Sequence, residues 1–155
     1  MNSLANKLVK TILILLIIST VAFIFIQSTK SKEESKSDSD KVGDIIEEII
    51  PPQTPAGDFV QTNLRKIAHF TEFFWLGTEV AVLVAVFYFH RFGIPLSYAF
   101  GILIAATDET IQIFSERGPS VRDVMIDFLG FAASTVIIYT LSAIIKLIFE
   151  KRKQK

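Results

Sequence analysis

The sequence predicts an all-α membrane protein built as a polytopic transmembrane bundle of four helices. Half of its 155 residues are hydrophobic, and most of them collect in four long runs, at 8–26, 67–89, 94–114 and 124–149. About 20 apolar residues in a helix cross the ~30 Å hydrocarbon core of a bilayer. The chain has no cysteine, which excludes disulfides and thiol chemistry, and its net charge of zero gives no sign of nucleic-acid binding.

The first run predicts an N-terminal transmembrane anchor over residues 1–27. Lys7 and Lys10 precede the stretch ILILLIISTVAFIFI, and this order is also that of a secretory signal peptide. The run ends in FIQSTKS, which lacks the small residues of a cleavage site, and it is longer than most signal cores. We therefore expect the helix to be retained.

Residues 28–64 separate this anchor from the other three runs. The stretch STKSKEESKSDSDK, at 28–41, is polar and charged, and predicts a disordered outer tether. In VGDIIEEII, at 42–50, the apolar residues fall on one helical face and predict a short amphipathic helix that the following prolines end. This helix either lies on the outer leaflet or packs on the bundle. Residues 65–150 then form a three-span domain, and 151–155 a basic tail.

The basic residues between the runs predict the orientation. Short cytoplasmic segments are enriched in Lys and Arg. We assign three segments to the cytoplasm by their basic residues, which are Lys7 and Lys10, then Arg91, then Lys146, Lys151, Arg152, Lys153 and Lys155. Both termini are then cytoplasmic. Four basic residues on the other side oppose this assignment, namely Arg65, Lys66, Arg117 and Arg122.

Polar side chains gather at the predicted outer end of three spans. His69 and Glu72 are spaced i, i+3, and Asp108 and Gln112 are spaced i, i+4, so each pair shares a helix face. An ionised group in lipid costs at least ~2.5–3.5 kcal/mol, and such groups usually face the bundle interior. Any one of them alone is typical of helix packing, but their clustering on three helices favours a pocket. The predicted pocket comprises Lys66, His69, Glu72, Asp108, Glu109, Gln112, Arg117, Asp123 and Asp127.

Two stretches resemble a known family. RKIAHFTEFFWLG, at 65–77, and DETIQIFSERGPSVRDVMIDFLG, at 108–130, are similar to the two signatures of the VanZ-like family. The resemblance covers residues 65 to about 138. It implies a small bacterial multi-span membrane protein, one of whose relatives is associated with resistance to the glycopeptide antibiotic teicoplanin, and it does not imply a reaction. Many members have Asn where this chain has Asp127. The signature positions in this chain are Lys66, His69, Phe70, Glu72, Leu76, Gly77, Asp108, Glu109, Gln112, Phe114, Arg117, Asp123, Asp127 and Gly130.

Three functions follow from the pocket, in this order. The first is binding or modulation of a membrane lipid or a lipid-linked cell-wall intermediate in the bacterial cell membrane. The second is an intramembrane hydrolase or transferase with His69 and the carboxylates as acid and base. The third is a proton-coupled transporter with Glu79 as a relay. No cofactor motif is evident, and a divalent metal is an alternative that no motif supports.

Overall fold

The chain folds into five helices over the residues that the structure describes, which are 3–88, 92–115, 118 and 120–153. In this computed structural model the helices are α1 (Ser3–Ser28), α2 (Lys32–Glu47), α3 (Pro55–Phe87), α4 (Gly93–Phe114) and α5 (Val121–Lys153). The all-α prediction is confirmed. Three helices, α1, α3 and α5, are long and apolar enough to cross a membrane, so the chain is a multi-pass membrane protein.

Helix α4 was predicted as a fourth span, and its bounds agree with the predicted run at 94–114. It is not among the three helices whose length and composition suffice for a span. Its last two turns carry Asp108, Glu109 and Gln112, which shorten its apolar part. Its 22 residues measure about 33 Å at 1.5 Å per residue, which is enough to cross the hydrocarbon core. The fourth crossing therefore stays a prediction.

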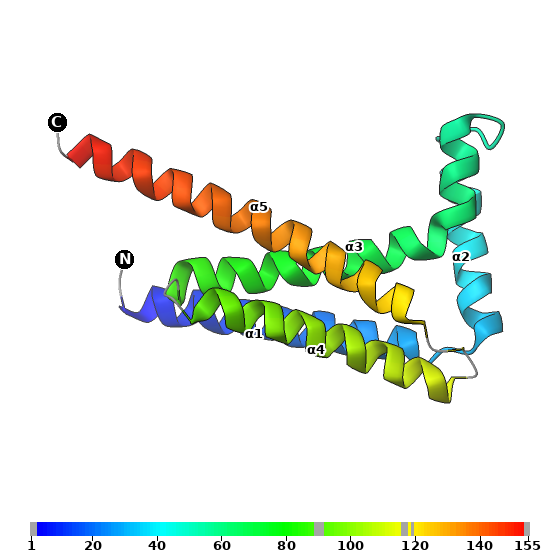
Figure 1. The fold of residues 1–155 in the computed structure, drawn as a ribbon, viewed down its shortest axis with the longest axis horizontal. Coiled ribbons are helices and arrows are strands. Elements are labelled where there is room, and N and C mark those ends of the chain that lie inside the picture. Colours follow the sequence, from blue (N-terminus) through cyan, green and yellow to red (C-terminus); the bar gives the residue numbers. More distant parts are fainter. Residues whose placement is uncertain (1–2, 89–91, 116–117, 119, 154–155) are drawn as a thin grey trace.

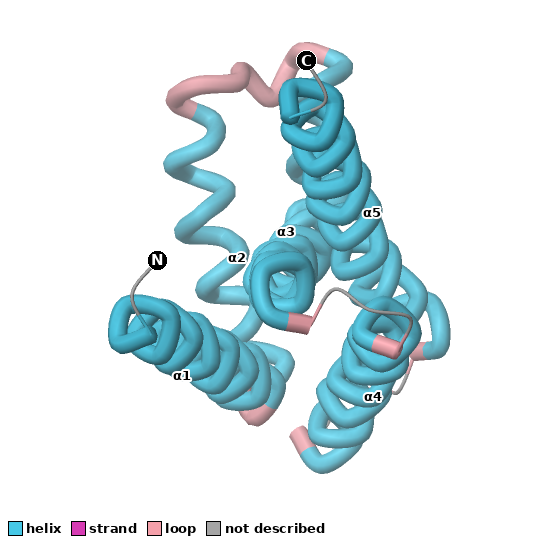
Figure 2. The backbone as a smooth tube through the Cα atoms, turned by 90° about the vertical axis from the view of Figure 1, so that its left-hand side faces the viewer, coloured by secondary structure: helices cyan, strands magenta, loops and turns pink. Residues whose placement is uncertain are grey.

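Helix α3 is the centre of the bundle and contacts each of the other four helices. Figure 2, which looks along the bundle, shows α1 and α4 below α3, with α5 crossing beside it. Figure 1 shows that the start of α1, the end of α3 and the end of α5 lie toward one end of the bundle. The end of α1, the end of α4 and the start of α5 meet at the other end. This second end is the one that carries the predicted polar pocket.

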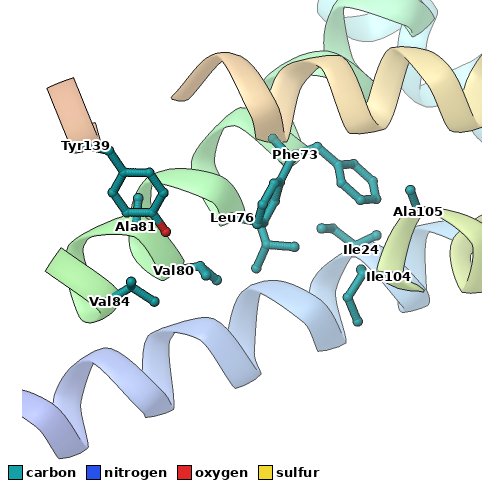
Figure 3. Close-up of a cluster of buried hydrophobic side chains, with 10 residues drawn as sticks. Ile24, Phe73, Leu76, Val80, Ala81, Val84, Ile104, Ala105 and Tyr139 are labelled. Atoms are coloured by element: carbon teal, nitrogen blue, oxygen red, sulfur yellow. The ribbon is translucent and has the colours of Figure 1, made fainter. Parts of the chain in front are cut away.

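The apolar core lies between α1, α3, α4 and α5, as Figure 3 shows. Phe73, Leu76 and Ala81 of α3 are completely buried, and Ile24 of α1 and Ala105 of α4 pack against them. Many large apolar side chains on the outside of α1, α4 and α5 remain exposed. In water so many exposed apolar side chains would promote association, whereas in a bilayer they face lipid.

The predicted disordered tether is wrong, because residues 32–47 form helix α2. The Ser31 hydroxyl accepts from the Glu34 backbone N–H, and the Glu34 side chain accepts from the Ser31 backbone N–H. This capping box satisfies two backbone donors at the start of the helix. Asp38 accepts from both Lys30, at 2.6 Å, and Lys41, at 3.3 Å. The composition indicated disorder, whereas the order of the same residues supplies a cap and ion pairs.

Helix α2 packs against the first part of α3 to form a hairpin. Nε2 of Gln61 donates to the Gly43 carbonyl at 3.3 Å and to Oε1 of Glu47 at 3.1 Å. Helix α3 starts well before the predicted run at 67–89, because Thr54 caps it and Pro55 occupies its first turn. Figure 1 shows that α3 bends, so that the hairpin stands across the end of the bundle, while the rest of α3 runs along it. The hairpin therefore places α2 beside the polar end of the bundle.

Candidate functional site

Three ionisable side chains from three helices meet in the interior at this end. They are His69 of α3, Asp108 of α4 and Asp127 of α5. Nδ1 of His69 lies 3.2 Å from Oδ1 of Asp127 and 3.9 Å from Oδ2 of Asp108. Both aspartates are fully buried, and the His69 side chain is 15% exposed. The predicted pocket thus has a buried centre made of one imidazole and two carboxylates, which we call the His–Asp–Asp cluster.

Helical spacing explains how two of these side chains become buried. On α4, Gly101, Ala105 and Asp108 lie on the face that packs into the bundle, and Gln112 continues that face. On α5, Asp127 lies on the buried face one turn before Phe131. Asp108 and Asp127 therefore stand on the buried faces of α4 and α5, where most of the neighbouring positions hold small or apolar residues.

Asp108 is held by hydrogen bonds from two helices. The Ser28 hydroxyl, at the end of α1, contacts Oδ1 of Asp108, and it also lies 2.8 Å from the Ile24 carbonyl. Nε2 of Gln112 donates to Oδ2 of Asp108 at 2.9 Å, and Oε1 of Gln112 accepts from Nη2 of Arg65 at 3.0 Å. A guanidinium thus reaches Asp108 indirectly, through an amide.

Asp127 has a different environment, although it is just as deeply buried. Neither of its carboxylate oxygens has a hydrogen-bond partner, and neither does Nδ1 of His69. The imidazole and the carboxylate are close enough for an ion pair, but their geometry is not that of a hydrogen bond. Most buried polar groups in proteins are paired, so three orphaned atoms at one point require an explanation.

Two glycines bring α3 and α5 close together beside this cluster. A Cβ atom on Gly77 of α3 would lie 2.6 Å from the Phe131 carbonyl oxygen of α5. A Cβ atom on Gly130 of α5 would lie 3.1 Å from the Phe70 carbonyl carbon of α3, and closer still to its oxygen. Small residues allow membrane helices to approach at such distances. The contact at Phe70 adjoins His69, so it fixes the distance between α3 and α5 at the cluster.

A large groove runs along the cluster, between α1, α2 and α3. It has a volume of about 780 Å³. One part of its wall is apolar and includes Leu16, Phe23 and Trp75, which are 46%, 51% and 62% exposed. The other part is polar and includes Arg65 and His69. The groove therefore joins an exposed apolar surface to the His69 side of the cluster.

An ion pair lies in the wall that α2 contributes to this groove. Nζ of Lys30 lies 2.6 Å from Oδ2 of Asp38, and both residues line the groove. The hydrogen bond from Lys30, followed by the one from Lys41, lowers the pKa of the Asp38 carboxyl below its ordinary value. Asp38 therefore carries its charge at neutral pH, and Lys30 is already paired with an acid. Arg65 hydrogen-bonds to the neutral amide of Gln112, and no acid among the described residues lies within 4.0 Å of it.

A smaller cavity of about 250 Å³ lies on the other side of His69. Arg65 and His69 line both cavities, and the smaller one is also lined by Lys66 and Asp123. Nζ of Lys66 donates to Oδ1 of Asn63 at 3.2 Å, on the exposed face of α3. Lys66 and Glu72 both belong to the predicted pocket, but they do not form an ion pair among the described residues.

The other predicted pocket residues are divided between different places. Glu72 is half-buried and lines the large groove one turn after His69. Glu109 is buried but points away, and its Oε1 accepts from the Ser120 backbone N–H at the start of α5. Arg122 is exposed, and it forms no ion pair with the acids of the described residues. Arg117 lies outside the described residues.

Two polar contributors were not in the predicted pocket. Arg65 could have been found, because it lies i, i+4 from His69 on the same face of α3. Ser28 could not have been found from the sequence, because it contacts Asp108, which lies 80 positions away along the chain. Glu79, the expected relay, is buried deeper along α3, and its Oε1 accepts from the Thr20 hydroxyl at 3.1 Å.

Comparison with known proteins identifies the family. The family model described as VanZ/LLP1 matches residues 13–146. This chain belongs to the VanZ/LLP1 family. Searches of curated proteins and of solved structures found no match.

The extent of this match includes more than the two signature stretches, which begin at Arg65. It starts within α1 and takes in α2, so the groove and all three members of the His–Asp–Asp cluster lie inside the VanZ/LLP1 region. The cluster also explains why the two stretches accompany each other, since His69 comes from the first and both aspartates from the second. Gly77 of the first stretch and Gly130 of the second allow the backbones of α3 and α5 to approach closely, so the two stretches lie side by side.

Proposed function

We propose that this VanZ/LLP1 protein binds an anionic membrane lipid or a lipid-linked cell-envelope intermediate in the groove between α1, α2 and α3. The observation that carries the proposal is the groove itself, because it joins an apolar, exposed wall to a polar end. An acyl or polyprenyl chain fits the apolar part, and a phosphate-bearing headgroup fits the polar part.

Arg65 is the residue we propose for the headgroup. Its side chain lines the groove and uses one N–H donor on Gln112, which leaves other guanidinium donors for a ligand. Arginine forms paired, charge-assisted hydrogen bonds with phosphate. Lys30 also lines the groove, and binding to it competes with its ion pair to Asp38.

The membrane arrangement is part of the proposal. The start of α1 and the end of α5 lie at the same end of the bundle in Figure 1, which requires an even number of crossings, so α4 is proposed as the fourth span. The basic termini then lie in the cytoplasm of a bacterial cell, and the cluster lies toward the outer leaflet.

A contribution to teicoplanin resistance is tested by the inhibitory concentration of that antibiotic with and without the gene.

The test is native mass spectrometry of the detergent-extracted protein, prepared in EDTA. We expect a retained amphiphile whose mass distinguishes a phospholipid from a lipid-linked intermediate, and at least a tenfold lower retention in Arg65→Gln. Lys66→Gln is the matched control, since this neighbouring cation is exposed and bonded to Asn63. Equal retention by Arg65→Gln and the unmodified protein contradicts the proposal.

A second function, hydrolysis or group transfer on such a ligand, is favoured by one observation. His69 lines the groove, while its Nδ1 faces the Asp127 carboxylate. An imidazole oriented by a carboxylate is a common general base. Incubation with a radiolabelled lipid-linked envelope precursor tests this function, because product formation must disappear in His69→Gln although lipid retention persists.

A further inference from the structure

We propose that the His–Asp–Asp cluster binds one divalent cation through His69, Asp108 and Asp127. The three side chains come from three helices, and one nitrogen or oxygen atom of each lies within 4.8 Å of the others. Two ligand atoms about 2.1 Å from an ion are about 3 Å apart at a right angle and about 4.2 Å apart when opposite. The observed separations of 3.2 Å and 3.9 Å from Nδ1 of His69 fall in this range. A small rotation of one carboxylate would bring the two aspartates within the same range of each other.

The orphaned atoms support a ligand rather than a simple ion pair. Asp127 is fully buried, yet neither of its oxygens accepts a hydrogen bond, and Nδ1 of His69 is buried without a partner. Nδ1 of His69 and Oδ1 of Asp127 are the two atoms that face each other in the cluster. Oδ2 of Asp108 accepts one hydrogen bond, from Gln112, and a carboxylate oxygen keeps a second lone pair for an ion.

Charge balance points the same way. Two ionised carboxylates and a neutral imidazole carry two negative charges, and buried charges in proteins are paired or coordinate metals. Among the described residues, no Lys or Arg lies within 4.0 Å of either aspartate. A divalent cation at the cluster compensates both charges with no further cation from the protein.

A proton is the competing explanation, and it makes a different prediction. The Ser28 hydroxyl has one hydrogen but two oxygens within reach, at Asp108 and at the Ile24 carbonyl. A protonated Asp108 could donate to Ser28, and a charged His69 could then pair with Asp127. In that case the cluster is neutral without any metal, and added cations leave the protein unchanged.

The ligand set favours a metal that accepts both nitrogen and oxygen. Carboxylates suit Mg²⁺ and Mn²⁺, whereas imidazole suits first-row transition metals. Mn²⁺ satisfies both and is also paramagnetic, so it is the probe. His69 lines both cavities, whereas neither aspartate of the cluster lines either, so the imidazole separates the two cavities from the carboxylates.

The experiment titrates Mn²⁺ into the full-length chain, purified in detergent, stripped with EDTA and desalted. Free Mn²⁺ is counted by electron paramagnetic resonance. We expect one bound Mn²⁺ per chain, and at least tenfold weaker binding in both Asp127→Asn and His69→Gln. The control is Asp58→Asn, because Asp58 is an exposed carboxylate in the first turn of α3. This variant should bind Mn²⁺ as the unmodified chain does.

Two further measurements use only the unmodified protein, so they remain valid even if a variant fails to fold. Bound Mn²⁺ should show the electron spin echo modulation of a directly coordinated imidazole nitrogen, and it should raise the melting temperature. Absence of stoichiometric binding, absence of the nitrogen signal, or unchanged binding in either cluster variant overturns the proposal. Because this titration uses no lipid and the lipid assay uses EDTA, failure of one proposal is distinguishable from failure of the other.

Discussion

Replacing Gly130 by alanine should separate α3 from α5 at the point where the cluster is assembled. The new methyl carbon would lie 3.1 Å from the Phe70 carbonyl carbon, and nearer to its oxygen, whereas ordinary contacts are about 3.5–4.0 Å. Both contact atoms belong to backbone, so no side chain can rotate away. The helices must move apart by about 1 Å before the methyl carbon and the Phe70 carbonyl oxygen are in ordinary contact.

The magnitude follows from measured overpacking. Inserting a methylene into a packed interior typically costs about 1–3 kcal/mol. For a chain of about this size, 1 kcal/mol shifts the melting temperature by about 2–4 °C, so the expected decrease is about 2–12 °C. Since Asp127 lies three residues before Gly130, the shift also moves its carboxylate relative to His69. We therefore expect Gly130→Ala to weaken Mn²⁺ binding as well.

The assay is thermal unfolding in detergent, followed by near-ultraviolet circular dichroism. The control is Gly118→Ala, because a Cβ atom at Gly118 would meet nothing within 4 Å. A Gly130→Ala protein that melts together with the Gly118→Ala protein would refute the argument that the glycine sets the distance between the helices.

Further predictions concern α2 and the α4–α5 contact. Ser31→Ala removes the cap of α2 and should destabilise its first turns by about 0.5–2 kcal/mol, seen as greater mobility of a spin label on α2, with Ser37→Ala as the control. Hydrogen bonds from Ser31, first from its backbone, lower the pKa of the Glu34 carboxyl. The ionised Glu34 carboxyl therefore stabilises the start of α2 above its ordinary pKa of 4.5, and this stabilisation is lost as the pH falls below that value. We expect the spin label to become more mobile in acid. A mobility that does not change with pH contradicts this prediction. Tyr139→Phe removes the 2.8 Å hydrogen bond to Ser97 and should cost about 0.6 kcal/mol on unfolding; a loss above about 2 kcal/mol would show a larger role for the hydroxyl.

The sequence predicted the helices of the bundle better than it predicted residues 28–64, which include α2 and the first turns of α3. Long apolar runs are a local signal, and they located α4 to within one residue. The start of α3 was missed because its first turns are polar, and they pack on α2 instead of spanning lipid. Composition alone indicated disorder for α2, whereas its stability depends on a capping box and on a partner helix.

The candidate site was predictable to the extent that helical spacing determines it. The i, i+4 relation of Asp108 and Gln112 predicted a shared face, and the two side chains are hydrogen-bonded at 2.9 Å. Glu109 separates from its neighbour Asp108 because consecutive residues point about 100° apart on a helix, and it bonds to Ser120 instead. No spacing rule could supply Ser28, which depends on how α1 packs against α4.

The position of α2 has a consequence for how a ligand arrives. The hairpin stands across the polar end of the bundle, and α2 residues line the groove there, while the apolar wall of α1 and α3 faces outward. Under the proposed function, a lipid dissolved in the leaflet would enter the groove from the side of its apolar wall, whereas a ligand coming from water would first meet α2. The proposed ligand would then reach the groove by two-dimensional diffusion within the bilayer. Occupancy should depend on the mole fraction of the ligand among the lipids rather than on its concentration in water.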